Sequence, residues 1–183
     1  MSVHQARFPA FSRLLHWLMA VMVLAMLFLG IGMASSVSER YRVLVAIHRP
    51  LGLAILGLAA VRLINRLLNP PPPLPDTIPP VERLAAKTSY VLLYALMFLM
   101  PLLGWGMLSA APYPIVIYGS LHLPPILPHD PTLYAWLRRL HTDFAFLLFA
   151  VFLAHLGAAL MHGLIRRDGV LQSMASWRPG RED

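Results

Sequence analysis

Four long apolar runs constrain the fold of this sequence more than any other feature. They cover about residues 14–33, 43–68, 88–109 and 140–165, and each reaches the roughly 20 residues that a helix needs to cross a membrane. Of the 183 residues, 58% are hydrophobic and 13% are charged, which leaves more apolar surface than a soluble domain of this length can bury. We therefore predict an all-α membrane protein, with the whole chain forming a single domain built on a four-transmembrane-helix bundle.

The segments between the runs predict how the spans are joined. The first run exceeds the roughly 7 to 15 apolar residues of a signal peptide, so we expect it to be retained as a span. The segment "NPPPPLPDTIPP" at residues 69–80 cannot be helical, because successive prolines fix φ and lack an N–H donor, and it should form a stiff inner connector. The outer loop, residues 110–135, is broken by prolines and is expected to fold over the outer face as irregular or short helical structure.

The basic residues predict the orientation of the bundle. With the N-terminus inside, ten of the 15 lysines and arginines fall on the inner side and five on the outer side, which supports an N-in/C-in topology. The outer five are Arg40, Arg42, Arg49, Arg138 and Arg139. Because the basic residues cluster at the ends of apolar runs and not on one patterned face, we expect no nucleic acid partner.

The sequence contains no cysteine, and this excludes several kinds of site. Disulfides, iron–sulfur clusters and haem attached through a C-x-x-C-H motif all require thiols. Histidine and methionine remain as the soft ligands of the chain.

Four histidines lie inside the apolar runs, and their depths match in pairs. His16 lies about one turn from the inner end of the first run, whereas His48 lies within about two turns of the outer end of the second. His141 begins the fourth run at the outer side, and His155 follows 14 residues later. That spacing places His155 about 21 Å deeper, within roughly 40° of the same helix face. One helix therefore offers an imidazole near each membrane surface.

This pairing predicts two stacked haems. A haem iron with two axial imidazoles needs two histidines from different helices at one depth, and His48 with His141 and His16 with His155 meet that requirement. A lone intramembrane histidine is more often an interhelical hydrogen-bond partner, but the joint match in depth favours iron ligation. His162 lies seven residues beyond His155, near the inner surface, where we expect it to contact a lipid headgroup or a haem propionate.

Motifs along nearly the whole chain resemble the bacterial cytochrome b561 family. They are "LLHWLMA", "IHRPLGLAILGLAAVRLINRLLNPPPPLP", "YVLLYALMFLMPLLGW", the histidines 14 residues apart, and "MHGLIRRDGVL". Family members are four-helix di-haem membrane cytochromes, and some are superoxide oxidases that pass electrons to quinone. The resemblance implies the same four histidines as axial ligands of two haems b, ubiquinone as the electron acceptor, and a multi-pass location in the bacterial inner membrane. The chain departs from the family at "KTSY", where members often carry a histidine.

Other residues are candidates for supporting these haems. Arg49, Arg138 and Arg139 flank the predicted outer ligands, where they could pair with propionates and also concentrate an anion such as superoxide. The corresponding candidates on the inner side are Arg13, Arg62 and Lys87, although the positive-inside rule already explains their number. Gly52 lies one turn beyond His48 and either allows close helix packing or lets a macrocycle lie against the backbone.

We therefore predict an enzyme of the membrane that oxidises superoxide at the periplasmic face and reduces quinone. One alternative is a cytochrome b subunit that relays quinol electrons to a periplasmic or membrane partner protein. A second alternative, from another class, is a non-redox membrane protein whose histidines bind a transported metal.

Overall fold

The computed structural model describes residues 7–75, 77–119 and 121–176, and these are mostly helical. The elements are, in chain order, α1 (Ala10–Ala34), α2 (Glu39–Leu68), α3 (Pro80–Ala110), β1 (Ile115–Tyr118), β2 (Leu121–Leu123), α4 (Pro131–Leu160), the π-helix η1 (Met161–Arg166) and α5 (Val170–Ala175). Among the described residues, four segments are long and apolar enough to cross a membrane: α1, α2, α3, and α4 continued through η1. The all-α membrane fold expected from the sequence is therefore confirmed.

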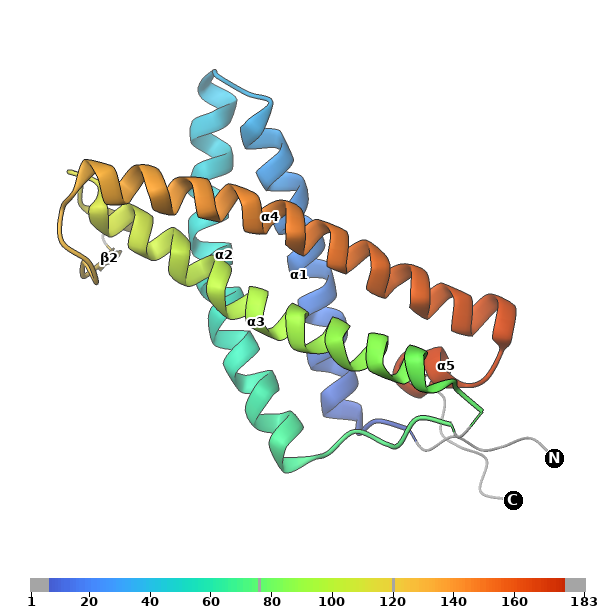
Figure 1. Ribbon diagram of the computed structural model, residues 1–183. Coiled ribbons are helices and arrows are strands. Elements are labelled where there is room, and N and C mark those ends of the chain that lie inside the picture. Colours follow the sequence, from blue (N-terminus) through green and yellow to red (C-terminus); the bar gives the residue numbers. More distant parts are fainter. Residues whose placement is uncertain (1–6, 76, 120, 177–183) are drawn as a thin grey trace.

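The four long helices form two hairpins that cross. Helix α1 packs along α2, and α3 packs along α4 (Figure 1). In Figure 1 the α3–α4 pair runs obliquely across the α1–α2 pair. Because of this crossing, α4 approaches α1 and α2 only over limited stretches of its length.

The buried core is small and lies where the hairpins cross. Met19, Val23, Ile55, Ala59 and Met97 form its fully buried cluster, from α1, α2 and α3. Helix α4 adds a partly buried phenylalanine at position 152. Many other large apolar side chains on the helices are exposed, as expected for surfaces that lipid covers.

The segment before α4 differs from the expected irregular or short helical loop. Here β1 and β2 form an antiparallel hairpin, in which Ile115 pairs with Leu123 and Gly119 adopts a positive φ of 53°. The β-branched stretch "IVIY" favours an extended strand over a helix. Helix α4 then begins at Pro131, earlier than the predicted boundary near residue 140, because Asp130 caps it by accepting from the N–H groups of Thr132 and Leu133.

Helix α3 also begins earlier than the apolar run that predicted it. Its first residue is Pro80, a residue type favoured at the first helical position, whereas the run begins near residue 88. Its opening turns contain Glu82, Arg83 and Lys87, so a hydropathy pattern detects the apolar span but not the polar start of the helix. The proline-rich connector is correspondingly shorter, residues 69–79.

Candidate functional site

The fold brings the four histidines together in two pairs. In the inner pair, the ring centroids of His16 from α1 and His155 from α4 lie 6.2 Å apart, with an interplanar angle of 65°. In the outer pair, the centroids of His48 from α2 and His141 from α4 lie 6.1 Å apart, also at 65°. Helix α4 thus supplies one imidazole to each pair, α1 and α2 supply the others, and α3 supplies none.

The spacing within each pair suits one metal ion between two imidazoles. A metal–imidazole bond is about 2.0 Å long and the ring centroid lies about 1 Å beyond the nitrogen, so two axial rings have centroids roughly 6 Å apart. Each pair offers only two nitrogens, and no group of three or more His, Cys, Asp or Glu suited to a metal occurs among the described residues. A metal held only by protein usually needs three or four ligands, whereas haem brings four of its own.

The hydrogen bonding of the outer pair also fits a ligand site. His141 has a backbone hydrogen bond with Met100, and a histidine that binds a metal commonly donates its second ring N–H to a backbone carbonyl. Nδ1 of His48 is buried and makes no hydrogen bond in the described part of the chain. The residues present therefore fit haem b, which His48 with His141 and His16 with His155 would hold.

A glycine of α3 lies against the outer pair. A Cβ atom added at Gly104 would lie 3.4 Å from Cε1 of His141, so the backbone of α3 supports this imidazole although α3 contributes no ligand. The sequence analysis missed this residue, and no signal distinguishes it from the other glycines of the spans. Gly52, in contrast, faces Cε of Met26 at 3.5 Å, which places it in the α1–α2 packing.

The inner pair carries a cation behind one of its rings. Nη2 of Arg62 lies 2.9 Å from Nδ1 of His16, and Nη1 lies 4.0 Å from Sδ of Met19. An arginine side chain can only donate, so in this contact Nδ1 of His16 is the acceptor and Nε2 carries the ring proton. If His16 held iron through Nε2, that proton would lie on Nδ1, which would then face the guanidinium without a hydrogen bond. Arg13, another of the predicted inner contacts, donates from Nη1 to the carbonyl oxygen of Phe8 at 2.7 Å.

The outer arginines are divided between two hollows. Arg49 lines one of about 680 Å³, between the start of α2 and the β-hairpin. Arg138 and Arg139 line another of about 450 Å³ on α4. Arg139 is paired with Asp143, Nε to Oδ2 at 2.9 Å, an i,i+4 pair that the sequence spacing could have revealed. Arg138 has no carboxylate partner among the described residues.

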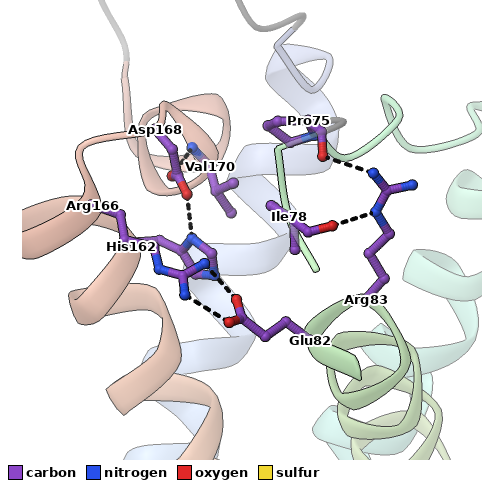
Figure 2. Close-up of polar contacts among 8 residues, drawn as sticks. All are labelled: Pro75, Ile78, Glu82, Arg83, His162, Arg166, Asp168 and Val170. Atoms are coloured by element: carbon purple, nitrogen blue, oxygen red, sulfur yellow. Dashed lines mark hydrogen bonds and ion pairs between the residues drawn. The ribbon is translucent and has the colours of Figure 1, made fainter. Parts of the chain in front are cut away.

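Four polar residues at the inner end, Glu82, His162, Arg166 and Asp168, form what we call the inner clasp (Figure 2). Nδ1 of His162 lies 2.5 Å from Oδ2 of Asp168, and both side chains are largely buried. Arg166 donates to both carboxylate oxygens of Glu82, at 2.5 and 2.6 Å, which ties η1 to the first turn of α3. Nδ1 of His162 is thus engaged by a carboxylate of the same chain, and its expected contact with a headgroup or propionate stays a prediction.

The backbone explains how Asp168 reaches His162. Helix α4 ends in the π-helical turn η1, and Arg167 and Gly169 have positive φ values of 53° and 84°. These left-handed residues reverse the chain, so Asp168 points back at the helix that precedes it, and its Oδ1 accepts from the N–H of Val170 at 3.2 Å.

The short helix α5 then packs under the bundle. A Cβ atom at Gly163 would meet Cδ2 of Leu171, so a larger residue there would force Leu171 to shift where α5 crosses η1. Phe8 donates its N–H to the carbonyl oxygen of Ser173 at 3.2 Å, and Nε1 of Trp17 donates to that of Met174 at 3.2 Å. The end of the described chain is therefore bound to the beginning of α1, beside His16.

Comparisons with known proteins agree with this geometry. A family model described as prokaryotic cytochrome b561 matches residues 7–177. Among curated proteins, cytochrome b561 homolog 2 of Escherichia coli (strain K12) is 29% identical over 171 residues, covering 92% of this chain and 90% of the relative. Cytochrome b561 homolog 1 of the same organism is 25% identical over 137 residues, covering 75% and 77%.

Proposed function

We propose, from the premise that this chain belongs to the prokaryotic cytochrome b561 family, that it oxidises superoxide at the outer face of the bacterial inner membrane and reduces a membrane quinone. Family membership makes it a membrane electron-transfer protein that uses haem b. The finer statements, that it holds two haems, that the donor is superoxide and that the acceptor is ubiquinone, form the proposal.

The proposal is carried by the two histidine pairs, in which the ring centroids lie 6.2 and 6.1 Å apart. Haem b, when bound, supplies a reversible one-electron couple of its iron. The two histidines of each pair would both hold the iron, so neither site would leave an iron position open to a substrate. Donor and acceptor must therefore meet the protein at its outer and inner ends, where the side chains decide what can approach.

At the outer end, arginine side chains favour an anionic donor. The guanidinium of Arg138 carries its charge without a carboxylate partner among the described residues, three positions before His141, and Arg49 follows His48 directly. A basic surface of this kind attracts small anions and accelerates their arrival. Each superoxide gives up one electron and leaves as dioxygen, so two are needed for each quinone, which takes two electrons and two protons to become a quinol.

The topology proposed for the chain is N-in/C-in in the inner membrane. It rests on the excess of basic residues at the ends that the sequence assigns to the inner side. In that orientation the inner clasp and α5 lie at the cytoplasmic end of the bundle, and the β-hairpin lies at the periplasmic end.

The proposal is tested by rapid mixing of the oxidised, purified protein with superoxide. We expect reduced b-type absorption bands to appear within the mixing experiment, and added ubiquinone to reoxidise the protein. A pyridine haemochrome assay should give two haems per chain. Reduction by a quinol with no response to superoxide would contradict the proposed donor and would favour the relay to a partner protein. A spectrum without b-type bands would favour the transported-metal alternative.

A further inference from the structure

The inner and outer pairs differ in what lies beside Nδ1 of their rings. Beside His16, Nη2 of Arg62 lies 2.9 Å from Nδ1. In the outer pair no cation contacts a ring nitrogen in the described part of the chain: Nδ1 of His48 has no hydrogen-bond partner there, and His141 has a backbone hydrogen bond with Met100. Arg49, although adjacent to His48 in sequence, makes no hydrogen bond to either outer ring among the described residues.

The position of Arg62 is fixed by three helices. It extends from α2 to His16 and Met19 on α1, and its guanidinium lies 5.7 Å from the ring centroid of Tyr94 on α3. The side chain is half-buried, and no carboxylate pairs with it among the described residues. A guanidinium remains protonated in proteins, so a full positive charge is held beside His16.

The surroundings of His16 differ from those of most metal-binding histidines. Such a histidine normally donates its second N–H to a carboxylate or a carbonyl, which makes the ring a stronger electron donor. Here the second nitrogen faces a fixed positive charge, which offers no acceptor for a ring N–H. Hydrogen bonds to the axial ligand, nearby charge and burial are among the means by which a protein sets the potential of a haem.

We propose that Arg62 raises the reduction potential of iron held by the inner pair above that of iron held by the outer pair. Reduction of ferric to ferrous iron adds one electron and lowers the positive charge of the site by one. The fixed charge of Arg62 therefore destabilises the ferric state more than the ferrous state, and its effect is strengthened by the low dielectric of the bundle interior. Transfer of an electron from the outer iron to the inner iron is then energetically favourable.

This inference rests on the haem sites of the proposed function but not on superoxide or quinone. The test is a spectroelectrochemical titration of the haem-loaded protein with Arg62 replaced by glutamine. We expect the reduction potential of the inner iron to fall by about 59 mV, which lowers the equilibrium constant for electron transfer from the outer to the inner iron about tenfold. The reduction potential of the outer iron should stay the same. A His155→Ala variant, which should retain only the outer haem, shows which measured potential belongs to which site.

Three further variants separate charge from size. Arg62→Lys keeps the charge and should keep most of the potential, whereas Arg62→Met keeps much of the length and should behave as the glutamine variant does. Arg66→Gln is the matched control, because Arg66 lies one turn along the same helix and its guanidinium stacks on Tyr90 at 4.3 Å. It removes the same charge from a greater distance and should change the equilibrium constant less than threefold.

An inner potential that is unchanged or higher in Arg62→Gln and Arg62→Met, with low-spin spectra retained, would overturn the inference. Loss of the inner haem from both neutral variants but not from Arg62→Lys would overturn it too, since Arg62 would then hold the haem and not tune it. One haem per chain in the unsubstituted protein would instead contradict the proposed function.

Discussion

The two histidine pairs have almost the same internal geometry and very different surroundings. Their ring centroids lie 6.2 and 6.1 Å apart, and both have an interplanar angle of 65°. The inner pair is flanked by Arg62 and by Trp17, whose ring meets that of His16 edge-on at 5.5 Å. In the outer pair, Nδ1 of His48 is unpartnered in the described part of the chain, His141 has a backbone hydrogen bond with Met100, and hollows lined by arginines lie nearby. The helices thus set equal ring geometry, and the neighbouring groups make the two pairs chemically unequal.

The two ends of the bundle differ in the same way. At the inner end, the inner clasp joins the end of α4 to α3 and to the segment before α5 (Figure 2), and Trp17 joins α1 to α5. At the outer end, the link between α3 and α4 is a β-hairpin, and hollows of about 680 and 450 Å³ lie near the outer pair. We infer that the inner end is built for fixed geometry and the outer end for access by a small solute.

The largest expected effect distinguishes the two histidines at the inner end. His155→Ala should reduce the haem content from two per chain to one, because it removes one axial ligand of the inner pair. His162→Ala should keep two low-spin haems, since Nδ1 of His162 is engaged by Asp168 at 2.5 Å and lies about 10 Å beyond His155 along the helix. The pyridine haemochrome assay and the low-spin spectrum measure both. The reverse pattern would show that the inner pair is wrongly assigned.

The next effect concerns the two neighbouring arginines on α4. Arg138→Gln should slow reduction by superoxide roughly threefold at low ionic strength, because an unpaired charge steers an anion. Arg139→Gln is the matched control and should have a smaller effect, since its charge is already opposed by Asp143. Stopped-flow rates at two salt concentrations test this. Equal rates for both variants and the unsubstituted protein would leave these residues with a role only in topology.

A smaller effect is expected in the inner clasp, on stability. Asp168→Asn should destabilise the inner end by about 1–3 kcal/mol, because the buried carboxylate accepts from both His162 and the backbone of Val170. Thermal unfolding in detergent measures the loss, and the outer haem spectrum should persist until unfolding. An unchanged unfolding temperature would mean that α5 and Gly163 hold the inner end without the clasp.

The smallest effect should come from the other half of the inner clasp. Glu82→Gln removes the partner of Arg166, but the two side chains are 32% and 35% exposed, so the expected loss is only about 0–1 kcal/mol. It is measured beside Asp168→Asn under the same conditions. A loss as large as that of Asp168→Asn would show that the α3 contact, and not the α5 contact, fixes the end of α4.

Much of the fold could be predicted because membrane spans have a simple physical signature. A helix in hydrocarbon satisfies its own backbone and needs about 20 apolar residues, so hydropathy finds it without knowledge of its neighbours. The polar start of α3 at Pro80 and the capped start of α4 at Pro131 were missed because those turns extend beyond the apolar stretch. The β-hairpin was missed because two short strands carry a weak pattern.

The sequence by itself determined the four spans and the placement of His141 and His155 on one face of α4. It could do so because the 3.6-residue repeat of a helix fixes the depth and the direction of a side chain from its spacing alone. What only the tertiary structure decided are contacts between distant or reversed segments. Arg62 reaches His16 across 46 positions of the chain. Asp168, six residues after His162, would lie roughly 120° around a continuous helix, and it meets that histidine only because a π-helical turn and two left-handed residues reverse the backbone. Local periodicity cannot encode such contacts, because they depend on how separate elements pack and on where a helix stops.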